Sequence, residues 1–239
     1  DPVDPVDPVD TDKDFLDIYY MNDFHGAILE DGDSIGFAKI ANYLNYHKEL
    51  NPDNTIILAG GDMLQGSAIS NYYQGLSVID IMDEIGFDAF SLGNHEFDWG
   101  LDAVTQYFDE DETNGEANFP LLGANVFLKG TTTIPDHIDP YTIIEKGDLK
   151  IGVIGTIGYG LEYSIAASKV NEYEFAYPVP IVEEYAIHLR TVEECDIVIW
   201  VGHDSGNIND ELVNLNGDAS LDALFNAHSH NDYADTTED

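Results

Sequence analysis

The sequence has few basic residues. Lys and Arg number 8 against 47 Asp and Glu, so the formal net charge is −39 at pH 7. A chain this acidic repels nucleic-acid backbones and anionic membrane surfaces, which argues against a nucleic-acid polymer as its partner. It also repels a small phosphorylated molecule, so cations bound at a site would have to reverse the local potential. We interpret the charge as a solvated acidic surface whose self-repulsion is screened by salt.

Cysteine and long apolar runs are also scarce. Cys195 is the one cysteine, so an internal disulfide is excluded. Its place beside the apolar run 196–200 predicts a small core residue rather than a nucleophile. No apolar run reaches the length of a membrane span, and no segment has the pattern of a signal peptide. Hydrophobic residues still make up 44% of the 239 residues, enough for one sizeable core.

The two ends differ in composition from the rest. Residues 1–10 repeat Asp-Pro-Val, and proline at every third position opposes both a helix and a central strand. We therefore predict an extended, charged spacer over residues 1–13, of a kind that suits secreted or surface-anchored proteins. A polar tail is predicted over residues 233–239, and one folded domain over residues 14–232.

Within that domain, short apolar runs alternate with helical patterns. The spacing predicts strands at 15–21, 55–59, 87–92, 121–127, 149–154, 197–201 and 221–225. It predicts helices at 35–50, 76–85, 101–108 and 180–194. The alternation implies βαβ units and a mainly parallel core sheet, with some antiparallel pairing in the middle. The fold class is therefore α/β.

Five of the strands end in Asp, His or Asn, usually beside glycine. The segments are Asn22–Gly26, Gly60–Gly66, Gly93–Asp98, Gly202–Gly206 and Ala227–Asp232. Each alone is weak evidence, because a Gly-Asp pair usually only makes a turn. Together they are informative, because sites in open α/β sheets form at the carboxyl ends of strands. The histidines outside these segments are expected to be ordinary surface or loop residues: His47, His137 and His188.

The combined set of side chains predicts a metal site. Imidazole, carboxylate and amide groups suit Zn, Mn, Fe, Co or Ni, and the segments contain no thiolate. The donors outnumber the four ligands of a closed structural zinc site. This indicates two metal ions that share a carboxylate, the arrangement that clamps the entering and leaving oxygens of a phosphoryl group.

In their order along the chain, the five segments resemble the motifs of the calcineurin-like metallophosphoesterases. The resemblance extends from about Phe15 to Asp232. Gln65-Gly66 and Phe97-Asp98 are similar to the 5′-nucleotidase branch, whose members are secreted, periplasmic or surface-anchored. The resemblance implies an αββα sandwich of mixed sheets, a catalytic domain at residues 14–232, and an extracellular, periplasmic or cell-surface location.

The resemblance also implies a role for each candidate residue. One metal would be held by Asp23, His25 and His230, the other by Asn94, His203 and His228, with Asp62 bridging the two. The substrate phosphate would be contacted by Asn94 and His95.

His95 is the implied catalytic residue, and its role would be to stabilise charge on the phosphoryl group or leaving oxygen. Asp98 would orient His95 and keep it cationic. The structural alternative for Asp98 is the N-cap of the helix predicted at 101–108. Glu96 is interpreted as a supporting or structural residue.

The chain departs from the family pattern in two ways. Asn226 and Ala227 stand where the family usually has two glycines, and an asparagine there could crowd the backbone near His228. The 5′-nucleotidases also continue past the last motif into a nucleoside-binding C-terminal domain, whereas nine residues follow His230 here. We therefore expect the base-recognition part to be missing, and leave open whether the sandwich is complete. An unfinished sheet would favour self-association or a partner that supplies the missing part.

The leading functional hypothesis is a dinuclear phosphomonoesterase acting on 5′-nucleotides or similar small phosphate esters. A 2′,3′-cyclic nucleotide phosphodiesterase would share the same motifs. A metal-loaded surface module without catalysis is the alternative from a different class. The His95–Asp98 pair argues against that module, because a binding module has no need of it.

Overall fold

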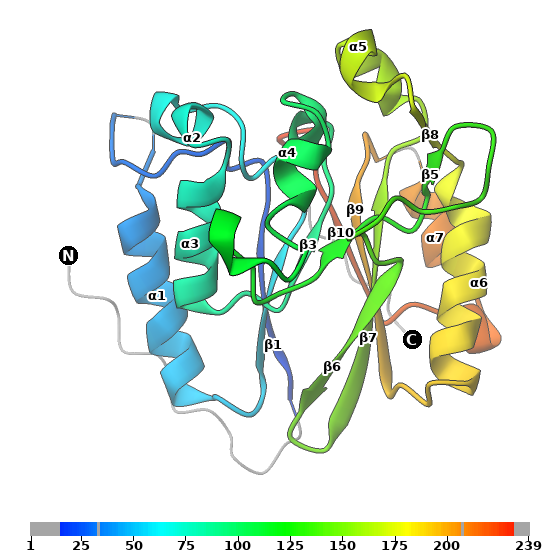
Figure 1. The fold of residues 1–239 in the computed structure, drawn as a ribbon. Helices are drawn as coiled ribbons and strands as arrows, with labels where there is room; N and C mark the ends of the chain where they lie inside the picture. Colours follow the sequence, from blue (N-terminus) through cyan, green and yellow to red (C-terminus); the bar gives the residue numbers. More distant parts are fainter. Residues whose placement is uncertain (1–14, 33, 207, 232–239) are drawn as a thin grey trace.

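The computed structural model describes residues 15–32, 34–206 and 208–231 (Figure 1). The spacer and the polar tail predicted at the two ends lie outside these residues. Two four-stranded sheets form the centre of the molecule. None of the helices in the described part of the chain is long and apolar enough to cross a membrane.

The first sheet is entirely parallel, in the order β1-β2-β3-β4. Its strands are β1 (Asp17–Met21), β2 (Thr55–Ala59), β3 (Ala89–Ser91) and β4 (Leu121–Leu122). Every residue of β2 is buried, as expected for a parallel strand covered on both faces.

The second sheet is mixed, in the order β10-β9-β7-β6. Its strands are β6 (Tyr141–Lys146), β7 (Leu149–Ile157), β9 (Ile197–His203) and β10 (Ala223–Asn226). β6 and β7 form an antiparallel hairpin, and the other pairs are parallel. The antiparallel pairing predicted for the middle of the chain is therefore confirmed. A separate pair, β5 (Val126–Leu128) and β8 (Tyr173–Phe175), is antiparallel.

Helices cover the outer face of each sheet (Figure 1). α1 (Phe37–Leu50) and α3 (Leu76–Ile85) pack on the first sheet, and α6 (Pro178–Thr191) packs on the second. The remaining helices are short: α2 (Ala68–Tyr72), α4 (Asp102–Thr105), α5 (Ala167–Val170) and α7 (Asn209–Val213). Single 3₁₀ turns are η1 (His95–Phe97), η2 (Glu112–Asn114), η3 (Leu161–Ser164) and η4 (Gly217–Ala219).

Side-chain alternation along the strands explains this layering. In β2, Ile56 and Leu58 pack between the two sheets, whereas Ile57 and Ala59 belong to the core under the helices. The inter-sheet layer receives Val153 and Ile199 from the second sheet. Successive residues of a strand point to opposite faces, so one apolar run serves two cores. The predicted αββα sandwich is confirmed.

Two predicted elements differ from the structure. The strand expected at 121–127 divides into β4 and β5, because Asn125 interrupts it. Its Nδ2 donates to the carbonyls of Ile157 and Ala176 at 2.6 and 2.7 Å, and its Oδ1 accepts from the Ile157 N–H at 2.9 Å. The helix expected at 101–108 shortens to α4.

Candidate metal centre

The candidate residues lie on the loops that follow β1, β2, β3 and β10 and at His203, the last residue of β9; these strands end at one edge of the sandwich. Several of these loops need unusual backbone geometry. A positive φ occurs at five of the seven candidate ligands, namely Asp23, His25, Asp62, His228 and His230. L-residues rarely adopt this conformation, and it clusters at functional sites.

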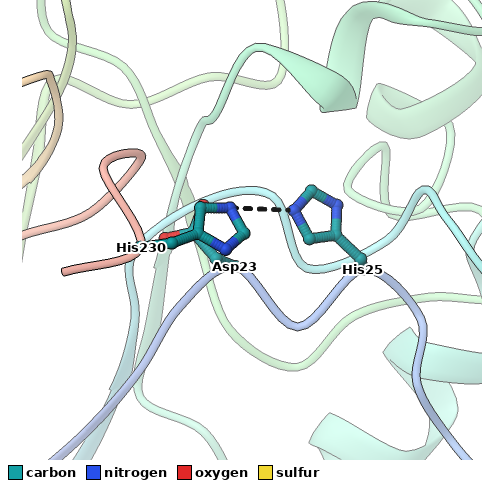
Figure 2. A group of neighbouring side chains, drawn as sticks. All are labelled: Asp23, His25 and His230. Atoms are coloured by element: carbon teal, nitrogen blue, oxygen red, sulfur yellow. Dashed lines mark hydrogen bonds and ion pairs between the residues drawn. The ribbon is translucent and has the colours of Figure 1, made fainter. Parts of the chain in front are cut away.

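The first group joins the two ends of the domain. Asp23 and His25 follow β1, and His230 follows β10 (Figure 2). The Nε2 atoms of His25 and His230 are 3.4 Å apart, and Nε2 of His230 lies 3.3 Å from Oδ1 of Asp23. The other oxygen of Asp23 accepts hydrogen bonds from the His228 N–H at 3.0 Å and from Asn22 Nδ2 at 2.6 Å. Oδ2 of Asp23 thus bonds to the loops after β1 and β10, whereas Oδ1 faces the His230 ring.

The second group is more deeply buried. Nε2 of His203 lies 3.1 Å from Oδ2 of Asp62 and 3.2 Å from Oδ1 of Asn94. His203 is fully buried, and its ring packs edge-on to that of His228 at 5.1 Å between centroids. Ligand atoms of Asp62, His203 and His228 all lie within 4.8 Å of one another. The structure therefore brings together all the residues predicted for this half of the site.

Asp62 lies between the two groups. Its carboxylate is within 4.8 Å of ligand atoms of His25 and His95, as well as those of His203 and His228. Burial raises the pKa of Asp62, but hydrogen bonding and the nearby charge of His203 lower it further, so the net pKa falls below its usual value. A carboxylate that remains ionised between two imidazole groups is suited to bridge two cations.

The donor set fits metal ions. Nδ1 of His203 is 2.8 Å from the Gly60 carbonyl, and Nδ1 of His25 is 3.0 Å from the Gln65 carbonyl. A carbonyl can only accept, so Nδ1 carries a proton in both rings and Nε2 is the nitrogen left to face a metal ion. For His203 this nitrogen lies beside the oxygens of Asp62 and Asn94. Among the described residues, the buried Oδ1 of Asp23 accepts no hydrogen bond, and its polar neighbour is Nε2 of His230 at 3.3 Å. A cation at this place would stabilise these converging oxygen and nitrogen atoms.

Glycines permit this close packing. Gly61 has φ +89°, and a Cβ there would lie 2.6 Å from Nδ1 of His203 and 2.7 Å from the Gly93 nitrogen. At Gly93 a Cβ would lie 2.4 Å from Oδ1 of Asp62. Both positions therefore need glycine for the loops after β2 and β3 to touch.

His95 and Asp98 form a pair beside Asp62 and His25. Nδ1 of His95 donates to Oδ2 of Asp98 at 2.7 Å, and the His95 N–H donates to Oδ1 of Asp62 at 2.8 Å. Burial lowers the pKa of His95, but the hydrogen bond with Asp98 and the charge of Asp62 raise it by more, so the net pKa is raised. The predicted N-cap role of Asp98 is wrong, because α4 begins after Leu101 and has no side-chain cap.

Glu96 is a supporting residue, as expected, but the sequence pattern did not indicate its partners. It is fully buried, and its carboxylate accepts four backbone hydrogen bonds. The donors are the N–H groups of Asp62, Met63, Leu64 and Gly93, at 2.8, 3.0, 3.2 and 2.9 Å. Burial, followed by the charge of Asp62, raises the pKa of Glu96 to about 7. The side chain ties the loop carrying Asp62 to the loop carrying Asn94.

The three other histidines lie outside the site. His137 is exposed and lines a separate cavity of about 380 Å³ that contains none of the candidate residues. His188 is on α6, and its Nε2 is 3.2 Å from the Tyr141 hydroxyl. The surface position expected for His47 is wrong: its exposed fraction is 8%, because the rings of Tyr19, Tyr43 and Tyr46 surround it.

Comparison with known proteins identifies the family. Residues 16–232 match the family described as calcineurin-like phosphoesterase. The chain belongs to this family, whose members are metal-dependent phosphoester hydrolases. The match covers the whole sandwich and all five strand-end segments.

Among curated proteins, the chain is 31% identical to a snake venom 5′-nucleotidase of Gloydius brevicauda over 210 residues, 83% of this chain and 34% of the relative. It is 30% identical to a 5′-nucleotidase of Vibrio cholerae, covering 89% of this chain and 38% of the relative. It is 26% identical to the cell wall protein Lmo0130 of Listeria monocytogenes, covering 90% and 33%. The chain thus spans about a third of the length of these relatives.

Solved structures show the same fold. The phosphoesterase YfkN of Bacillus subtilis matches with a TM-score of 0.75 at 24% identity, covering 90% of this chain and 72% of that chain. The NAD nucleotidase NadN of Haemophilus influenzae matches with a TM-score of 0.74 at 22% identity, covering 92% and 39%. At these identities the likeness concerns the fold alone.

Proposed function

We propose that this domain hydrolyses phosphate monoesters, most specifically those of 5′-nucleotides, at a centre of two divalent transition-metal ions. The observation that carries the proposal is the position of Asp62 between two groups of ligands. Asp23, His25 and His230 would hold one ion, and Asn94, His203 and His228 the other, with Asp62 shared. When bound, the ions would supply Lewis acidity and lower the pKa of water toward neutrality.

The protein's own residues supply orientation and charge. Asp98 holds the His95 ring by a 2.7 Å hydrogen bond and favours its protonated form. A cationic imidazole beside the metal groups can donate a hydrogen bond to a phosphoryl or leaving oxygen as negative charge develops there. Asn94, buried beside His203, offers its amide group to the same phosphate.

The charge of the chain gives the metals a second role. With a net charge of −39, the chain repels a nucleotide, and none of the candidate ligands is Lys or Arg. Two divalent ions would make the site locally attractive to phosphate. Metal binding would thus be required for substrate binding as well as for the chemical step.

The substrate class and location are supported by the relatives. Two of the compared proteins are 5′-nucleotidases, one of them from venom, and a third is a cell wall protein. These support a nucleotide substrate and an extracellular, periplasmic or cell-surface location. Because the chain spans about a third of these relatives, their full activities are carried over only as part of this proposal.

The test is phosphate release from 5′-AMP by the purified chain with added Mn²⁺ or Co²⁺, and again after chelation. We expect release that the chelator abolishes and that returns when the metal is restored. Parallel assays with 2′,3′-cyclic AMP distinguish the sibling activity, and preferential opening of the cyclic ester would replace the monoesterase assignment. A folded chain that carries two metals per molecule and hydrolyses neither ester would contradict the proposal. That result would favour the alternative hypothesis of a metal-loaded module without catalysis.

A further inference from the structure

Asn226 is the last residue of β10 and stands where the family resemblance expects glycine. In the parallel pairing of β10 with β9 it lies opposite Gly202, the residue before His203. It is followed by Ala227 and His228. Asn226 thus lies two residues before His228 and beside the end of β9, which carries His203.

The Asn226 side chain makes three hydrogen bonds. Its Oδ1 accepts from the Asp204 N–H at 3.0 Å and from the Ala227 N–H at 2.9 Å. Its Nδ2 donates to Oδ1 of Asn209, the first residue of α7, at 2.7 Å. The side chain therefore links three segments: the end of β10, the loop after β9 and the start of α7.

These partners lie next to the candidate ligands. Asp204 follows His203 directly, and Ala227 precedes His228 directly. A single amide oxygen therefore binds the backbone beside both histidines, whose ring centroids are 5.1 Å apart. The Ala227 N–H also donates to the Gly202 carbonyl at 3.1 Å, so it keeps a partner without Asn226. For the buried Asp204 N–H, the amide oxygen of Asn226 is the hydrogen-bond acceptor.

We propose that Asn226 is a positioning residue that holds His203 and His228 at the spacing required to bind the second metal ion. The inference rests on the proposed dinuclear site. Glycine at this position would allow the same course of β10, but it has no side chain that could bond to Asp204 and Asn209. Supporting hydrogen bonds around metal ligands commonly change metal affinity by 10- to 100-fold.

The test compares three variants with the intact chain. Asn226→Leu keeps the size of the side chain but removes all three hydrogen bonds, and Asn226→Gly restores the residue expected in the family. Asn226→Asp keeps an oxygen acceptor for both N–H groups. Asn214→Leu is the matched control, because Asn214 makes an exposed hydrogen bond to the Asp210 carbonyl on α7.

The first readout is backbone hydrogen exchange in the metal-free protein, which needs no catalysis. We expect the backbone N–H of Asp204 to exchange faster in the Leu and Gly variants. It should remain protected in the Asp variant and in the control. The second readout is calorimetric titration with Mn²⁺ alone. We expect one of the two binding steps to lose about tenfold or more in affinity in the Leu and Gly variants, and the other to stay unchanged. The Asp variant should stay within about threefold of the intact chain.

Two results would overturn the inference: unchanged exchange at Asp204 in Asn226→Leu, or unchanged binding of the second ion in both Asn226→Leu and Asn226→Gly. Tighter binding in Asn226→Gly would equally show that the asparagine does not position the ligands. If the intact chain bound fewer than two ions, the dinuclear assignment would fail instead, and the exchange measurement would still decide whether Asn226 holds the loop.

Discussion

Asp62 and His203 face each other in the interior of the site, with Oδ2 of the carboxylate 3.1 Å from Nε2 of the ring. The other oxygen of Asp62 accepts a hydrogen bond from the His95 N–H at 2.8 Å. Both oxygens therefore point toward residues of different loops, and Asp62 is 2% exposed. This geometry makes Asp62 the residue on which both halves of the candidate centre depend.

Replacing Asp62 with alanine should remove both metals, because it deletes the ligand that the two groups share and leaves the group of Asn94, His203 and His228 without a carboxylate. Metal content per chain, measured by elemental analysis after desalting, checks this. The intact chain loaded in the same way is the reference. Two metals retained by a folded Asp62→Ala variant would contradict the bridging role.

His95→Ala should behave in the opposite way. His95 is not among the proposed ligands, so the variant should keep two metals while kcat falls by roughly 10²- to 10³-fold, the usual cost of a lost contact to developing charge. KM should change much less than kcat. Asp98→Asn should give a smaller loss, because the ring remains but the partner that favours its cationic form is gone. Metal loss in His95→Ala would show that His95 is a ligand.

Glu96→Ala should destabilise the fold itself. The substitution leaves four N–H groups without their acceptor in the interior, and each unpaired buried donor costs roughly 1–3 kcal/mol. Because the surrounding loops can relax in part, we expect the free energy of unfolding to fall by about 3–5 kcal/mol in total. Urea unfolding measures this change.

The matched variant Glu96→Gln should cost less than Glu96→Ala. An amide oxygen in place of Oε1 still accepts from Met63 and Leu64, whereas the amide nitrogen cannot accept from Asp62 and Gly93. Glu183→Gln on the exposed face of α6 serves as the control and should be near neutral. Equal stability of Glu96→Gln and Glu96→Ala would show that the acceptor role has been overestimated.

The elements that the sequence predicted well are those defined by local signals. The bounds of β2 and α3 agree with the predicted ranges, because apolar runs there are flanked by glycine or proline. Gly86 adopts a left-handed conformation at the end of α3, as expected of a C-cap. The clustering of Asp, His and Asn side chains could be predicted because parallel strands bring their carboxyl ends to one edge, whereas the role of each residue came from the family resemblance.

The features that escaped prediction depend on contacts between distant segments. Asn125 ends a strand because it bonds to residues 157 and 176, which no local pattern indicates. Glu96 reaches back more than thirty residues to the loop after β2. At Asn226 the family motif suggested only crowding. The side chain instead makes hydrogen bonds with Asp204 and Asn209, which are distant in the sequence. Buried polar groups must find partners, but the sequence does not name them.

The charge of the chain makes a prediction about stability in salt. With a net charge of −39 the folded state repels itself more strongly than the expanded unfolded state, because its charges are closer together. Raising the salt from about 0.1 to 1 M shortens the screening length from about 10 to about 3 Å, so the free energy of unfolding should increase. KCl suits this test better than sulfate salts, which also strengthen apolar burial. Urea unfolding at several KCl concentrations, in metal-free protein, measures the effect. Stability that stays constant or falls over this range would show that self-repulsion is not what limits this fold.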